Sequence, residues 1–212
     1  MNYSFGSNLY HMLKHKLYEV LFSVSHLPDE LKDNSKREEL IKVVESQLSV
    51  RSLKKNQVIL TPGYIADHIY FLETGTARGY FYDGEGKEHT LYMWDERSII
   101  TDSMSYFSDQ PTDLYIEVSQ NSTLLSLSRE KLQEIMSAFP YLEVVIDSIF
   151  FNDFLACRKR IMDLISLNPV DRYNNLTKSF PKVDLKFQQQ DIASYLGTSR
   201  QTLSRSKRGE HP

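Results

Sequence analysis

The side chains of this chain best placed to do chemistry lie near its C-terminus, in the segment QQQDIASYLGTSRQTLSRSKRG over 188–209. The segment predicts two short helices, the first over 188–196. Gly197 stands where that helix must end and the backbone needs a positive φ, and Ser199 is placed to cap the second helix. Four residues mark where the two helices would pack: Ile192, Ala193, Leu196 and Leu203. Such a pair is typical of a helix-turn-helix, whose second helix enters the major groove of DNA.

The second helix of this pair would carry the side chains that contact DNA. Arg200, Gln201 and Arg205 are long hydrogen-bond donors. Arginine can bind guanine O6 and N7, and glutamine can bind adenine, so these three would read base edges. Contacts to phosphates would come from four further residues, Ser199, Thr202, Ser204 and Lys207. The alternative is an ordinary helical hairpin with a solvated polar face, and a two-helix pattern by itself does not separate the two interpretations.

Composition and charge restrict the class of protein. The 212 residues suffice for one large domain or two small ones, and 41% hydrophobic with 25% charged residues is ordinary for a globular protein. The net charge of −3 excludes a general nucleic-acid binder, whereas residues 186–212 hold five basic residues against two acidic ones. A single cysteine, Cys157, excludes an intramolecular disulfide and a Cys-ligated iron–sulfur cluster. With no apolar run of membrane-spanning length and no signal-peptide core, we expect a cytoplasmic protein.

The elements that must position the helix pair differ along the chain. Apolar residues have helical spacing over 8–24 and 36–48. From about residue 51 to Ser128, short aromatic and β-branched runs are broken by glycine turns. This pattern predicts six to eight short antiparallel strands in a barrel or sandwich. Ser128 is then placed to cap a further helix.

The segment over 140–168 has no internal proline or glycine and predicts one helix much longer than average. Pro169 ends it, and a further short helix is expected over 170–180. The long helix carries more aromatic residues than one buried face needs, so we favour a homodimer contact over burial within one chain alone. The residues assigned to that contact are Leu142, Val145, Ile149, Phe150 and Phe154.

Taken in order, these elements resemble the cyclic-AMP receptor protein/Fnr family of bacterial transcription regulators. The segment DHIYFLETGTARGY over 67–80 resembles the family's strand–turn–strand of the cyclic-nucleotide-binding fold. The segment SRQTLSR over 199–205 resembles its recognition helix, Ser-Arg-x-Thr-x-x-Arg. The resemblance implies an α+β fold: an N-terminal double-stranded β-helix, or jelly roll, of the cyclic-nucleotide-binding type, a long dimerisation helix and a C-terminal helix-turn-helix. We expect domains over 1–138, 139–168 and 169–212.

The function that this resemblance implies is that of a homodimeric, sequence-specific DNA-binding transcription regulator with an effector-sensing β-domain. Its partners would be double-stranded DNA, a second copy of the chain, RNA polymerase and a small-molecule effector. An alternative is a small-molecule sensor that signals by protein contact through a helix-turn-helix that no longer binds DNA. A short C-terminus with a truncated wing, and the weak basic charge, motivate that alternative. The chain has no Gly-rich phosphate loop and no Gly-x-Ser-x-Gly, and we expect no enzyme.

The sequence departs from the cyclic-AMP-binding members of the family where they clamp the cyclic phosphate. Their Gly-Glu and Arg-Ser pairs are replaced here by Thr101-Asp102 and Thr112-Asp113, and no arginine lies within 98–128. An aspartate would repel a phosphate, so we do not expect cyclic AMP, and the effector is unknown. The candidate effector-binding residues are Arg78, Tyr80, Thr101, Asp102, Thr112 and Asp113. Gln201 also stands where the cyclic-AMP-binding members usually carry a glutamate, which predicts a DNA half-site different from theirs.

Overall fold

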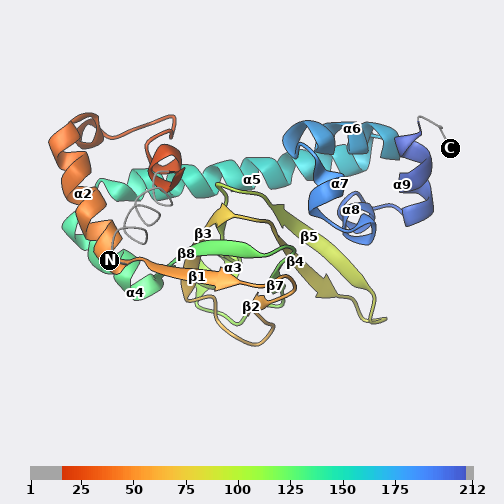
Figure 1. Ribbon diagram of the computed structural model, residues 1–212, viewed down its shortest axis with the longest axis horizontal. Helices are drawn as coiled ribbons and strands as arrows, with labels where there is room; N and C mark the ends of the chain where they lie inside the picture. Colours follow the sequence, from red (N-terminus) through yellow and green to blue (C-terminus); the bar gives the residue numbers. More distant parts are fainter. Residues whose placement is uncertain (1–15, 209–212) are drawn as a thin grey trace, which may run out of the picture.

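The computed structural model describes residues 16–208, and within them eight strands form two four-stranded antiparallel sheets (Figure 1). One sheet has the order β1-β8-β3-β6 and the other β2-β7-β4-β5. The strands are β1 (Ser49–Leu53), β2 (Val58–Leu60), β3 (His68–Thr74), β4 (Ala77–Tyr82), β5 (Glu88–Trp94), β6 (Ile99–Ile100), β7 (Tyr115–Val118) and β8 (Ser122–Ser128). The predicted jelly roll of six to eight short strands is therefore confirmed.

Helices precede, cover and follow this β-domain. Ahead of it lie a helical segment over 16–21 and the 3-10 turn Asp29–Lys32. The other helices are α2 (Asn34–Gln47), α3 (Ser103–Ser108), α4 (Arg129–Ala138), α5 (Leu142–Ser166), α6 (Pro169–Ser179), α7 (Val183–Lys186), α8 (Gln189–Tyr195) and α9 (Arg200–Lys207). The parts of our predictions that fall on 1–15 and 209–212, including the end of the truncated wing, lie outside the described residues. Within the described range, no helix is long and apolar enough to span a membrane.

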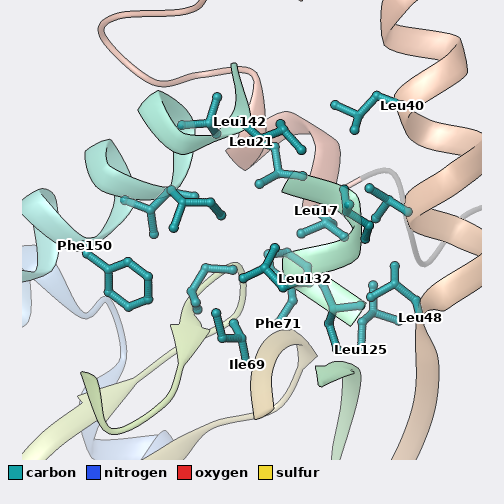
Figure 2. Close-up of a pocket in the computed structure, with 17 residues that line it drawn as sticks. Leu17, Leu21, Leu40, Leu48, Ile69, Phe71, Leu125, Leu132, Leu142 and Phe150 are labelled. Atoms are coloured by element: carbon teal, nitrogen blue, oxygen red, sulfur yellow. The ribbon is translucent and has the colours of Figure 1, made fainter. Parts of the chain in front are cut away.

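The β-domain has a core between its sheets and a second core behind one of them. Side chains alternate across a strand, so Tyr70 and Leu72 of β3 point between the sheets, whereas Phe71 points the other way. Phe71 joins the apolar layer formed by the N-terminal helices, α4 and the start of α5. A wholly apolar cavity of about 80 Å³ remains in that layer, and Figure 2 shows that its wall extends to Phe150 of α5.

The long helix α5 runs past the β-domain toward the C-terminal helices (Figure 1). It has 25 residues and ends at Leu167, whose backbone is extended. Asn168 caps α6, since its Oδ1 accepts a hydrogen bond from the Asp171 amide at 3.0 Å, and Pro169 occupies the first helical position. The predicted long helix is confirmed, with each end two residues inside the expected one.

Candidate functional site

The predicted helix pair is present as α8 and α9, joined by a tight turn. Gly197 adopts a φ of +61°, the left-handed value that glycine tolerates. The Thr198 amide donates to the Ala193 carbonyl at 2.9 Å and so closes the end of α8. Ser199 caps α9, because its Oγ accepts from the Thr202 amide at 3.1 Å. Both predicted signals, the glycine stop and the serine cap, are confirmed.

The inner face of the pair is anchored in a small apolar core. All four predicted packing residues are buried in it, namely Ile192, Ala193, Leu196 and Leu203. Leu176 of α6, Val183 of α7 and Met93 of β5 complete this core. The helix pair therefore packs on α6 and α7 and also contacts the β-domain.

The outer face of α9 holds the side chains predicted to contact DNA. Arg200, Gln201, Ser204 and Arg205 are exposed on it. Lys207 is placed differently, because its ammonium group donates to Asp184 and Gln189 and lies over the ring of Tyr173. The hydroxyl oxygens of Ser199 and Thr202 lie 2.9 Å apart and form a hydrogen bond with each other. Five of the seven predicted residues are thus exposed, with Ser199 at the start of the helix and the other four on one polar face of α9.

A second feature is a cavity of about 520 Å³ between β5, α5 and the C-terminal helices. Its wall is partly aromatic, with Trp94, Phe107 and Phe150, and Tyr92 stacks on Trp94 at a centroid distance of 5.2 Å. Pockets of this size bind small molecules. No periodicity in the sequence marks the cavity, because elements far apart in the chain enclose it, namely β5, α3, α5 and α8.

The polar groups of this cavity disfavour negative charge. Asp153 keeps part of its side chain exposed, and desolvation by the groups around it raises its pKa from its ordinary 3.8 to about 6. Burial also raises the pKa of Tyr92 to about 12 and raises that of the Cys157 thiol. Among the described residues that line the cavity, Arg160 is the only cation, and backbone carbonyls of Leu91 and Tyr195 accept its hydrogen bonds. An anionic ligand would therefore find no unengaged cation here.

The predicted effector residues are dispersed in the structure. Thr101 alone lines the large cavity. Asp102 and Thr112 are buried against each other, with the Thr112 hydroxyl donating to Asp102 Oδ2 at 2.6 Å. Asp113 is exposed, and Tyr80 is buried and stacks on Tyr115. The side chains that line the cavity on α5, Asp153 and Cys157 above all, were not predicted.

Arg78 has a different role from the predicted one. It is 8% exposed and makes ion pairs with Glu88 at 2.5 Å, Glu117 at 2.8 Å and Asp191 at 2.9 Å. Asp191 belongs to α8, so Arg78 links the β-domain to the helix pair rather than lining the cavity. Its pairing with a residue 113 positions away leaves no local signal in the sequence.

Most of the residues predicted for the dimer contact are covered within the chain itself, and one of them is largely exposed. Leu142 and Val145 are buried in the chain's own core, and Ile149 packs beside them. The ring of Phe150 lies edge-on to the ring of Phe107, with the two ring centroids 4.8 Å apart. Of the five, Phe154 alone is largely exposed. Seven large apolar side chains of α5 are exposed, and two of them are Phe154 and Ile161. The other five follow a spacing of seven, four, seven and three residues: Val144, Phe151, Leu155, Met162 and Ile165.

Comparison with known proteins agrees with this architecture. Residues 50–139 match the family model of the cyclic nucleotide-binding domain. No curated protein matches the chain in sequence. The solved structures that resemble it include regulators of the cyclic-AMP receptor protein/Fnr type.

Three of these structures show how far the likeness extends. The c-di-GMP responsive global regulator CLP of Xanthomonas campestris is 16% identical, with a TM-score of 0.64 over 81% of this chain and 90% of CLP. FixK2 from Bradyrhizobium japonicum is 16% identical, with a TM-score of 0.66 over 76% of this chain and 83% of FixK2. The catabolite activator protein of Thermus thermophilus is 19% identical, with a TM-score of 0.53 over 90% of this chain and 85% of the activator protein. The predicted family resemblance is confirmed in the fold.

Proposed function

We propose that this chain, whose residues 50–139 match the cyclic nucleotide-binding domain and whose fold is that of the cyclic-AMP receptor protein/Fnr regulators, is a homodimeric, sequence-specific DNA-binding transcription regulator. The observation that carries the proposal is the exposed face of α9. Arg200, Gln201 and Arg205 lie there on a helix whose opposite face is fixed by the buried Leu203. A rigid helix with long donors on one exposed face is what direct reading of the major groove requires.

The second copy would pack along the exposed stripe of α5. Spacing of seven, four, seven and three residues keeps an apolar seam on one side of a helix, as in a coiled coil. Five apolar side chains repeat in this way from Val144 to Ile165. A dimer around this seam would present two α9 helices to successive major grooves, about 34 Å apart along the DNA.

The effector would bind in the cavity between β5 and α5. Its aromatic wall and the raised pKa of Asp153 favour an uncharged, partly aromatic molecule over a phosphate. The buried Asp102 carboxylate, and the engagement of Arg78 and Arg160 elsewhere, further disfavour cyclic AMP. We retain the domain division at 138/139 and 168/169. We also retain a contact with RNA polymerase and a place in the cytoplasm, where bacterial DNA lies.

Selection of bound sequences from a random DNA library, with the full chain and across a salt series, tests this function. We expect one enriched near-palindromic motif and an affinity that falls steeply with salt. Arg200→Ala should cost about 1–3 kcal/mol and relax one base position in each half-site. The control is Arg51→Ala, an exposed arginine on β1. Absence of any enriched motif at low salt would overturn the proposal and favour a sensor that signals by protein contact alone.

A further inference from the structure

A buried ionic cluster joins the β-domain to the first helix of the helix-turn-helix. Arg78 of β4 is at its centre, with Nε donating to Glu117 of β7 and Nη1 donating to Glu88 of β5 and Asp191 of α8. The guanidinium also lies over the ring of Tyr80 at 4.3 Å. Two of its carboxylate partners come from the β-domain, and the third comes from α8.

Asp191 depends on this arginine more than the other two carboxylates do. The residue is 6% exposed, and this burial raises the pKa of its carboxyl group. The positive charge of Arg78 acts in the opposite direction and lowers that pKa. A buried carboxylate that loses its cation is costly. The helix α8 is therefore held against β4 and β5 by the Arg78–Asp191 ion pair, because moving α8 away separates the two charges.

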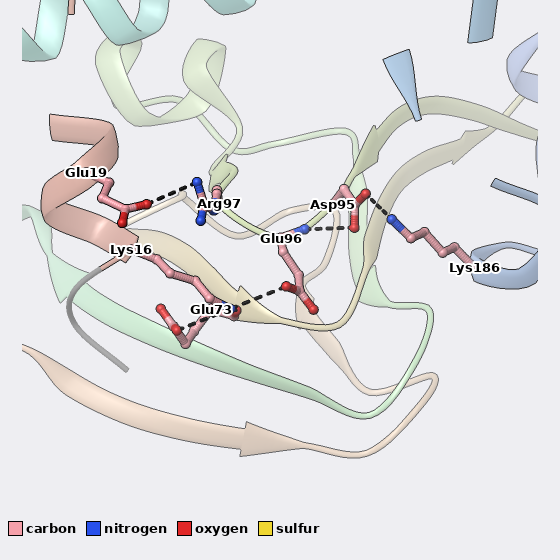
Figure 3. Close-up of polar contacts among 7 residues, drawn as sticks. All are labelled: Lys16, Glu19, Glu73, Asp95, Glu96, Arg97 and Lys186. Atoms are coloured by element: carbon pink, nitrogen blue, oxygen red, sulfur yellow. Dashed lines mark hydrogen bonds and ion pairs between the residues drawn. The ribbon is translucent and has the colours of Figure 1, made fainter. Parts of the chain in front are cut away.

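Further contacts hold the same junction closed. The Thr90 amide donates to Ser194 Oγ at 2.8 Å, which ties β5 to α8 directly. Lys186 of α7 forms an ion pair with Asp95, in the turn after β5 (Figure 3). Figure 3 also shows Arg97 of this turn paired with Glu19 of the N-terminal helical segment, so one turn is tied to both ends of the molecule.

The junction leaves the DNA-reading face uncovered. Arg200, Gln201 and Arg205 stay exposed while α8 is docked, so docking does not block DNA by occlusion. What docking fixes is the direction in which α9 points relative to α5. Because the proposed dimer forms along α5, that direction sets the distance between the two α9 helices.

We infer that the Arg78–Asp191 pair is an interdomain latch and that Arg78 is a positioning residue for operator recognition. The latch fixes the helix-turn-helix on β4 and β5 and thereby fixes the spacing of the half-sites that the dimer accepts. Strand β5 also forms a wall of the large cavity, through Leu91 to Trp94, so a bound effector would act on the surface that the latch grips. The regulatory role rests on the proposed DNA-binding function, whereas the latch itself does not.

The first experiment measures the latch without DNA. A spin label is attached to the cysteine of Ser204→Cys, in a chain that also carries Cys157→Ser so that no other thiol reacts. Pulsed electron paramagnetic resonance then measures the distance between the two labelled α9 helices of the dimer. We expect one narrow distance distribution. Asp191→Asn, which keeps the shape of the side chain but removes its charge, should broaden or displace that distribution. Asp109→Asn is the matched control, because it removes the ion pair of Asp109 with Arg129 inside the β-domain.

The second experiment measures spacing discrimination on the selected operator. Inserting or deleting one base pair between half-sites should weaken binding of the unmodified chain by at least about tenfold, and that of Asp191→Asn by clearly less. A fold that is merely less stable would not change this ratio. Lys186→Met, which removes the neighbouring ion pair, should change it in the same direction.

The two experiments separate failure of the latch from failure of the proposed function. A narrow, unshifted distance distribution in folded Asp191→Asn overturns the latch, as does unchanged spacing discrimination in that variant. If the unmodified chain selects no operator at all, the DNA-binding function fails. The distance measurement then still decides whether the helix pair is held by Arg78.

Discussion

Replacing Phe151 by alanine should dissociate the proposed homodimer without unfolding the subunit. Phe151 belongs to the exposed stripe of α5 and is 58% exposed in the single chain. A phenylalanine side chain buries roughly 200 Å², so complete cover in a dimer would remove about 115 Å² per copy from water. At about 25 cal/mol per Å² this is worth about 3 kcal/mol per copy.

Both subunits lose this contact in a symmetric dimer. The dimer dissociation constant should therefore rise by between about 10²-fold and 10⁴-fold, the upper figure applying if both rings are fully covered. Sedimentation equilibrium over a range of protein concentrations measures the change. The matched control is Tyr64→Ala, which removes an aromatic ring that is 70% exposed in the loop between β2 and β3.

Two outcomes would refute the reasoning about the seam. An unchanged dissociation constant in Phe151→Ala would mean that the stripe does not face a second copy. An equal weakening by Tyr64→Ala would mean that self-association is not confined to α5. The thermal unfolding of each variant at low concentration shows whether the subunit itself stays folded.

Three further perturbations follow from individual contacts. Gly197→Ala should destabilise the chain by about 1–2 kcal/mol in urea unfolding. The φ of Gly197 is +61°, and an added Cβ would lie 2.9 Å from Leu164 Cδ2. The control is Gly63→Ala: Gly63 has a φ of +87° and open space around it, so this variant should show the backbone cost alone. The uncharged fluorescent dye Nile red should bind the large cavity less tightly as the pH rises through about 6, because Asp153 ionises there and a bound dye would desolvate the charged carboxylate. Asp153→Asn should remove that dependence. Arg160→Lys should increase hydrogen exchange in α8, because an ammonium group cannot reproduce the planar set of bonds to backbone carbonyls of β5 and α8.

The features that sequence reasoning predicted correctly are local ones. The caps at Ser128 and Ser199 and the positive φ of Gly197 each depend on residues within one turn of the chain. The strand runs and the length of α5 depend on side-chain periodicity, which is also short-range. The short helix α7 was missed, since four residues are too few for a helical period to show.

The division of faces on α5 could not be predicted in this way. The helix is apolar on two faces, and each residue turns the helix by about 100°. Leu142, Val145 and Ile149 face the core of the chain, whereas Phe151, two positions after Ile149, faces nearly the opposite direction. Periodicity identifies both stripes, but only the docking of α5 on the sheet decides which of them is covered.

A charged residue inside a strand poses a similar problem. From sequence, Arg78 was a candidate for a polar ligand pocket. A buried arginine needs an anion beside it. The structure supplies three carboxylates instead, one of them on α8. The same physical requirement was met within the chain, by a residue that no local pattern connects to Arg78.

The arrangement along one face of α5 suggests why sensing and DNA reading could be linked in this chain. The face that begins with Leu142 and Val145 in the core continues over the large cavity with Asp153 and Cys157, and reaches the C-terminal helices at Arg160. A helix is stiff along its axis. On α5, Arg160 donates hydrogen bonds to backbone carbonyls of β5 and of the end of α8 and so holds both. A ligand that moves the wall of the cavity must therefore either displace α5 or strain the junction with α8, and both responses change the orientation of α9.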